Sequence, residues 1–190
     1  MRIKRLMSAL AIATCVTLPT GGGAAAAITA HNVRDASTVQ VSAGVYFTAY
    51  QNDDLPGATV VLTGAIGDFG EAVSVLPNGM VDPEHSSQLR LGLAQGTFRI
   101  SIGPLHAKFV NALSHAPYDL KTCSGHAAVT GPAPVVPGSG TGAYTGISGT
   151  LELTITGNEV DAKPGCRPFS GSALLAQSIV IAGPGTVSIQ

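Results

Sequence analysis

The chain has 190 residues, the length of one ordinary domain, with only 11 % charged and 45 % hydrophobic residues. This composition argues against a coiled coil, which is rich in Glu, Lys and Arg, and against a disordered chain, which lacks so many apolar residues. A formal net charge of −1 argues against a nucleic-acid partner, because such proteins normally carry a basic surface.

Residues 1–27 have the composition of a signal peptide. Three basic residues lie between Arg2 and Arg5, residues 6–18 are apolar, and Ala25 to Ala27 supply the small side chains that signal peptidase requires. We therefore expect cleavage after Ala27 and an exported protein, either secreted or held in the cell envelope. A membrane anchor and a lipoprotein modified at Cys15 are the alternatives, but the apolar run is short for either.

Cleavage changes the charge of the mature chain. It removes three of the ten basic residues and none of the eleven acidic ones, so the net charge falls from −1 to −4. No second apolar run is long enough to span a membrane, so we expect no membrane span after signal removal. Residues 28–37 then form a flexible N-terminal arm, and residues 38–190 form the folded domain.

Residues 38–190 are dominated by strand patterns. In 88–93 and again in 97–102, apolar side chains alternate with polar ones, and Gln95-Gly96 between them is a plausible hairpin turn. The same kind of reasoning predicts strands at 39–47, 58–66, 71–76, 88–93, 97–102, 105–111, 120–130, 150–156, 173–182 and 186–190. Residues 131–142, rich in Gly and Pro, are expected to form a loop.

Helix signals are few. One turn is possible in 110–115, and 173–182 could be a short buried helix, although its Ile and Val residues favour a strand. Many short strands in one domain predict an all-β fold, a single antiparallel β-barrel of about eight strands, with a β-sandwich as the alternative.

Two cysteines, Cys123 and Cys166, remain after signal removal. An even number of cysteines in an exported chain favours a disulfide bond between them. Two buried thiols or a metal pair are the alternatives, but the chain has no CxxC or Cys-His spacing. Such a bond would close a long loop and contribute roughly 4 kcal/mol to stability, before any strain in the folded state.

The most specific string is GTGAYTGISGT, Gly140 to Thr150. Its glycines allow bends that other residues resist, and a regular strand pattern follows it. The string resembles the signature of the allene oxide cyclase and dirigent-like barrel superfamily. The resemblance is closer to small exported actinobacterial proteins of this kind and covers most of residues 45–190. Further segments that carry it are Leu55-Pro56-Gly57, Thr63 to Gly70, Val81 to Leu89 and Thr122 to Gly125.

The resemblance implies an eight-stranded antiparallel barrel with a hydrophobic interior. It implies no chemistry here, because Ser148 stands where plant dirigent proteins often carry Arg. We therefore interpret the string as a structural loop formed around Gly140, Gly142, Tyr144 and Gly146.

Other polar residues give weaker signals. Asp82, Glu84 and His85 could hold a metal ion or move a proton, but a solvated polar loop between two strands is the simpler explanation. If 105–111 is a strand with its apolar face inward, His106 and Lys108 point outward; in the reverse orientation, His106 contacts a ligand. Further residues considered are the turn formers Asp53, Asp54 and Asp68, and the tyrosines 46, 50, 118 and 144, whose hydroxyls could reach a pocket.

These patterns assign no catalytic residue, metal ligand or cofactor. They favour an exported barrel that binds a small hydrophobic molecule without catalysis. The alternatives are a cyclase- or dirigent-type enzyme that shapes a hydrophobic substrate, and a surface module that binds another protein. An apolar cavity without an ionisable pair favours binding, a paired acid and cation favours the enzyme, and a filled barrel with an exposed apolar patch favours the protein-interaction module.

Overall fold

The computed structural model describes residues 42–52, 57–82, 85, 87–163 and 174–189. Contact clustering divides the chain between residues 37 and 38, and every described helix and strand belongs to the second unit, residues 38–190. The predicted signal peptide, 1–27, and the predicted arm, 28–37, lie outside the described residues.

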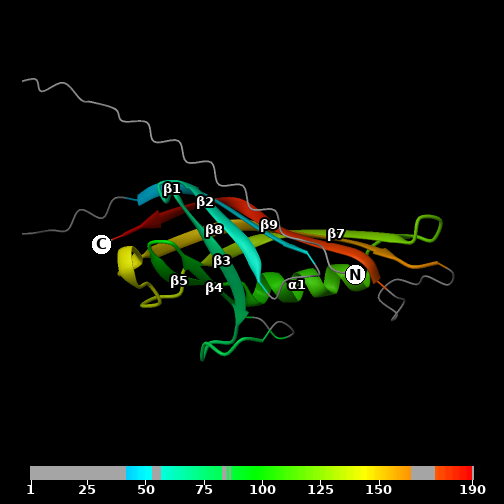
Figure 1. The fold of residues 1–190 in the computed structure, drawn as a ribbon, viewed down its shortest axis with the longest axis horizontal. Coiled ribbons are helices and arrows are strands. Elements are labelled where there is room, and N and C mark those ends of the chain that lie inside the picture. The colour runs from blue at the N-terminus through cyan, green and yellow to red at the C-terminus, as the bar shows by residue number, and fades with distance from the viewer. Residues whose placement is uncertain (1–41, 53–56, 83–84, 86, 164–173, 190) are drawn as a thin grey trace, which may run out of the picture. The chain divides into compact units, whose positions relative to one another are not determined.

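The second unit is built on one antiparallel sheet that curls into a half-barrel (Figure 1). Its nine strands lie in the order β5-β4-β3-β2-β1-β9-β8-β7-β6. Their bounds are β1 Ser42–Asn52, β2 Ala58–Gly64, β3 Asp68–Val75, β4 Gln88–Leu93, β5 Gly96–Ser101, β6 Tyr118–Asp119, β7 Ser124–Pro134, β8 Ser148–Asp161 and β9 Leu174–Ser188. The expectation of a mostly β fold is therefore confirmed, and the described strands form one sheet rather than the two of a sandwich.

The core lies on one face of this sheet because apolar and polar residues alternate along the strands. In β7, for example, Ala127, Val129, Gly131 and Ala133 are buried while the residues that alternate with them are exposed. The same alternation in β1, β4 and β8 buries Phe47, Leu91 and Leu153 on the same face of the sheet.

One end of the half-barrel is joined across its two edges. After β7 the chain runs along β5, where Val135 forms a bridge to Ile100. Val136 N–H donates to Arg99 O at 2.8 Å, and Thr141 N–H donates to Thr97 O at 2.8 Å. These bonds cover the edge of β5, which would otherwise present unpaired backbone groups.

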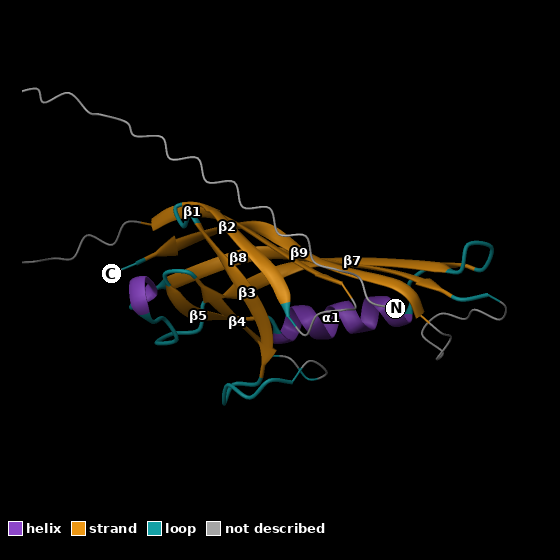
Figure 2. Cartoon of the chain, in the orientation of Figure 1, coloured by secondary structure: helices purple, strands orange, loops and turns teal. Residues whose placement is uncertain are grey.

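The prediction of a strand at 105–111 is wrong, because Gly103–Ser114 forms a helix, α1 (Figure 2). Pro104 stands in the first turn, where proline favours a helix. The helix packs on β7 and β8 with Leu105 and Phe109 buried. Gly157 permits this close approach, since a Cβ at that position would lie 2.6 Å from the ring of Phe109.

Several boundaries also differ from the predictions. Residues 131–134 continue β7 instead of forming a loop, and their two prolines fit because this part of β7 pairs regularly with β8 alone. The two strands predicted at 173–182 and 186–190 are one long strand, β9. The turn between β4 and β5 is formed by Ala94 and Gln95, one residue earlier than expected.

Candidate functional site

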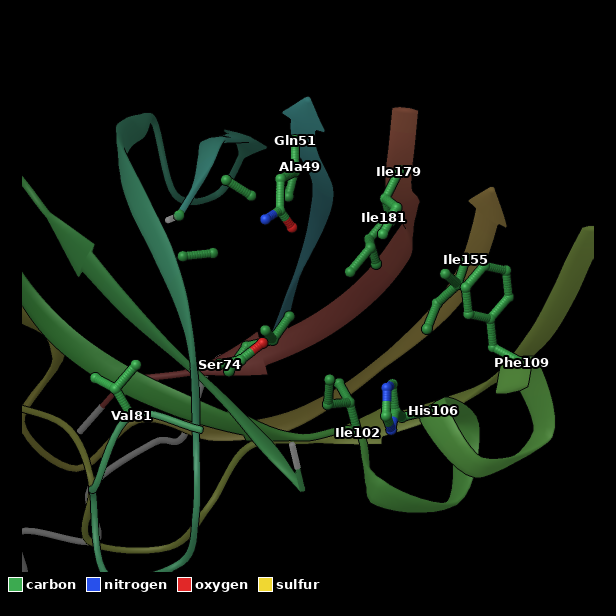
Figure 3. A pocket seen from close by; sticks show the side chains of 14 residues that line it. Ala49, Gln51, Ser74, Val81, Ile102, His106, Phe109, Ile155, Ile179 and Ile181 are labelled. Atoms are coloured by element: carbon green, nitrogen blue, oxygen red, sulfur yellow. The ribbon is translucent and has the colours of Figure 1, made fainter. Parts of the chain in front are cut away.

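A cavity of about 230 Å³ lies between the concave face of the sheet and the start of α1 (Figure 3). Strands from both halves of the sheet contribute to its wall. Its described lining consists of Ala49, Gln51, Gly57, Ala58, Ala72, Ser74, Val81, Leu89, Ile102, His106, Phe109, Ile155, Ile179 and Ile181. Most of these side chains are apolar, as in small-molecule sites generally.

The cavity exists because small residues occupy inward positions on three adjacent strands. Ala49 of β1, Ala58 of β2 and Ala72 of β3 line it, and Ala58 pairs directly with Ala72. Elsewhere on the same strands the inward positions carry larger side chains such as Phe47 and Leu62, which fill the core. The change from large to small side chains leaves a space that α1 does not fill.

The opposite wall of the cavity carries branched apolar side chains. Ala49 pairs with Ile181 on β9, and Ile181 pairs with Ile155 on β8, so these three side chains form one row across the sheet. Ile179 lies beside Ile181, and Phe109 reaches the cavity from α1 (Figure 3). This wall offers dispersion contacts and no charge to an occupant.

Three polar side chains face the cavity: Gln51 from β1, Ser74 from β3 and His106 from α1 (Figure 3). All three are half-buried. Among the described lining residues, His106 is the only one with an ionisable side chain. The helix thus places His106 at the cavity, although the strand predicted around it is absent.

The tyrosines considered from the sequence do not line this cavity. Tyr46 and Tyr50 are each 48 % exposed. Tyr118 lies in β6, where its hydroxyl donates to Asp161 Oδ2 at 2.6 Å. Burial, together with the hydrogen bond to Asp161 and the negative charges of Asp161 and Glu159, raises the pKa of Tyr118 to about 12.

Asp82 and His85 lie in a surface loop. His85 N–H donates to Asp82 Oδ1 at 3.0 Å, the side chains approach to 3.3 Å, and the His85 side chain is 75 % exposed. Glu84, the third member of this sequence cluster, lies outside the described residues. Within the described part of the chain, no three His, Cys, Asp or Glu side chains lie close enough together to hold a metal ion.

The GTG string forms a turn that packs against the β4–β5 hairpin. Gly142–Tyr144 is a single 3-10 turn, and Gly142 and Gly146 have positive φ angles of 60° and 77°. A Cβ at Gly140 would fall within 1.8 Å of Tyr144 O. Tyr144 is buried and its ring packs edge-on against Phe98, with 5.3 Å between the ring centroids.

Asp68 is the polar centre of this end of the fold, not only a turn former. Its carboxylate accepts from Tyr144 Oη at 2.5 Å and from the backbone N–H groups of Phe69, Ala94 and Gln95. Burial acts to raise the pKa of Asp68, but these four hydrogen bonds outweigh it and hold the pKa below its ordinary value. The ionised carboxylate therefore stabilises the fold above an unfolded pKa of about 3.9, and this contribution is lost as the pH falls through the lowered folded value.

A second, shallower depression lies where β6, β7 and β8 meet, with a volume of about 420 Å³. Tyr118, His126 and Glu159 line part of it. One carboxylate oxygen of Glu159 is buried and has no hydrogen-bond partner among the described residues. Burial, and then the charge of Asp161, raise the pKa of Glu159. Its open shape makes this depression a poorer small-molecule site than the apolar cavity.

Cys123 is buried just before β7, and Cys166 lies outside the described residues. The predicted disulfide bond between them therefore stays a prediction. The described neighbours bring the two segments together: Asp161 N–H donates to Cys123 O at 2.8 Å, and Lys163 Nζ donates to Lys121 O at 2.5 Å.

Sequence reasoning missed the cavity and the helix that forms one of its walls. Leu105, Phe109, Ala112 and Leu113 follow the helical spacing of three and four residues, which was the available signal. It was obscured because Leu105, Ala107 and Phe109 also alternate as in a strand.

A scan against protein-family models and searches of curated proteins and of solved structures find no match to this chain. None of the helices in the described residues is both long enough and apolar enough to cross a membrane.

Proposed function

We propose that this protein is an exported β-barrel that binds a small hydrophobic molecule, without catalysis, in the cavity between α1 and the sheet. The observation that carries the proposal is the apolar lining of a partly open cavity of about 230 Å³. Natural pockets for small ligands have this character, with a few polar groups that orient the ligand.

We also propose that the half-barrel closes into a barrel. Eight strands, from β5 to β7 in the sheet order, form the barrel, and the bonds of Val136 and Thr141 to β5 support closure at one end. This arrangement agrees with the resemblance of the GTG string to the allene oxide cyclase and dirigent-like superfamily. A barrel of about eight strands is wide enough to hold one small ligand.

Export is proposed on the composition of residues 1–27. Amino-terminal sequencing of protein from the culture supernatant should place the mature end between Ala27 and His31. Recovery of a chain that keeps Met1 in the membrane fraction would contradict export.

The two alternative functions find less support in the cavity. A cyclase- or dirigent-type site would pair an acid with a cation, whereas the described lining offers one ionisable side chain, His106. A protein-interaction module would use an exposed apolar surface, and Val61 and Phe69 do form an exposed pair on β2 and β3. That pair is small, and the cavity is open space rather than a filled core.

The test is to fill the cavity and measure probe binding. A neutral fluorescent probe, N-phenyl-1-naphthylamine, is titrated into wild type, Ala72→Phe and the milder Ala72→Leu. Ala72 is buried and lines the cavity. Both variants should lose affinity for the probe, Phe more than Leu, because the added side chain occupies the ligand's space.

Val61→Phe is the matched control, since Val61 is exposed on the neighbouring strand and does not line the cavity. This variant should bind the probe as wild type does. Equal binding by folded Ala72 variants and wild type, or no saturable binding by wild type, would contradict the proposal.

A further inference from the structure

The polar side chains of the cavity differ in chemistry from its apolar wall. His106 projects from α1 toward the space, and Ser74 projects into it from β3 (Figure 3). Within the described part of the chain, neither the His106 imidazole nor the Ser74 hydroxyl has a side-chain hydrogen bond. Both groups are therefore available to a molecule in the cavity.

Each of the three polar side chains can donate a hydrogen bond. The imidazole, the hydroxyl and the Gln51 amide all carry a donor, and no carboxylate is present in the described lining. A cationic ligand group would find no opposite charge here. An anionic oxygen beside α1 would find the His106 imidazole as a donor, and a bond to a charged acceptor is stronger than one between neutral groups.

The size of the space limits the ligand. An apolar cavity of about 150 Å³ holds one benzene molecule, so by proportion a space of about 230 Å³ takes about nine carbons, and because the cavity is partly open a larger probe can extend beyond it. The apolar part would lie against Ile155, Ile179 and Ile181, which leaves the polar end beside α1 (Figure 3).

We infer that the ligand is a small apolar monocarboxylic acid whose carboxylate accepts a hydrogen bond from His106. This inference rests on the proposed function, because it assigns a ligand class to the same cavity. His106 is then the residue that determines specificity, and the isoleucines supply the greater part of the contact area.

The test compares three molecules with the same chain and different ends: octanoate, 1-octanol and octylamine. Each displaces N-phenyl-1-naphthylamine from wild type, His106→Phe and His106→Gln. His106→Phe keeps a ring and removes the donors, while His106→Gln keeps an N–H donor. His126→Phe is the matched control, since His126 is exposed on β7 and does not line the cavity.

We expect octanoate to displace the probe from wild type at the lowest concentration of the three. His106→Phe should weaken octanoate about tenfold or more, the value of one hydrogen bond to a charged group, and leave 1-octanol nearly unchanged. His106→Gln should recover part of the loss, and His126→Phe should match wild type.

Two results would overturn the inference and can be told apart from failure of the proposed function. If 1-octanol or octylamine binds as tightly as octanoate, or if folded His106→Phe and His106→Gln both bind octanoate as wild type does, the ligand class is wrong while cavity binding stands. If the probe itself does not bind wild type, the proposed function fails, and the inference fails with it.

Discussion

At the scale of single residues, the buried polar network and the apolar cavity lie in different parts of the molecule. Asp68 and Tyr144 form a fully bonded buried pair at the end where the GTG string packs on the β4–β5 hairpin. His106 faces the apolar cavity beside α1. The GTG string, the most specific motif of the sequence, therefore supports the fold. His106, which faces the proposed ligand, lies in residues 105–111, whose alternation wrongly predicted a strand.

Tyr144→Phe should destabilise the protein by about 1–3 kcal/mol, because it removes one buried hydrogen bond to a charged carboxylate. Urea unfolding at pH 7 measures the change. Tyr46→Phe is the matched control, since Tyr46 is half exposed on β1, and this change should be close to neutral. An equal effect of the two changes would contradict the role given to Tyr144.

Glu159→Gln should raise Tm at pH 7. Burial and Asp161 raise the pKa of Glu159 in the folded state, so its contribution to stability is present below the unfolded pKa of about 4.3 and is lost as the pH rises through the folded value. Glu159→Gln removes the destabilisation that ionised Glu159 causes at pH 7. The difference in Tm between the variant and wild type should therefore shrink as the pH approaches 4.

Glu152→Gln on the same strand is the control, because Glu152 is exposed. Thermal melting at pH 7 and pH 4 should show a pH-dependent difference for Glu159→Gln only. A Glu159→Gln protein that melts below wild type at pH 7 would show that the ionised carboxylate is stabilising.

At the scale of elements, the sequence predicts strands better than their junctions. The hairpin of β4 and β5 follows its alternation almost to the residue, because each strand buries one face. The helix α1 was missed because two patterns compete in this segment. Leu105, Ala107 and Phe109 alternate as in a strand, whereas Phe109 and Leu113 have the four-residue spacing of a helix. Which pattern prevails depends on packing against β7 and β8, distant in sequence.

Gly142→Ala should be much more destabilising than Gly138→Ala. Both glycines have positive φ, 60° and 68°, so each alanine incurs the strain of a left-handed residue, about 1–2 kcal/mol. At Gly142 the added Cβ would also lie 2.5 Å from Gln95 O, whereas nothing lies within 4 Å at Gly138.

Urea unfolding of the two glycine variants separates backbone strain from the clash. Equal losses for both would mean that the turn moves away from β5 without cost. The account of the GTG string as a packed structural loop would then be wrong.

The pairing of Cys123 with Cys166 remains a prediction that the neighbouring segments favour. Thiol labelling of the unfolded, unreduced mature protein should detect no free cysteine. Cys123→Ser and Cys166→Ser should lower Tm by similar amounts, since either change opens the same loop. Two labelled thiols per chain would refute the bond.

At the scale of the whole molecule, a curled sheet and one helix border a cavity that local sequence patterns do not predict. The mostly β class follows from alternation, which is visible in short windows. The cavity depends on alanines in β1, β2 and β3 facing isoleucines in β8 and β9, so its lining is scattered from residue 49 to residue 181. The register of the strands brings these residues together, and composition does not predict that register.

Binding of a small hydrophobic molecule in this cavity can be observed by NMR of isoleucine methyl groups. Ile102, Ile155, Ile179 and Ile181 line the cavity, while Ile66 and Ile147 are buried elsewhere in the core. Titration with N-phenyl-1-naphthylamine should shift the four lining methyls along one saturable curve and leave Ile66 and Ile147 nearly unmoved. Shifts confined to other methyls, or none at saturating probe, would contradict the account.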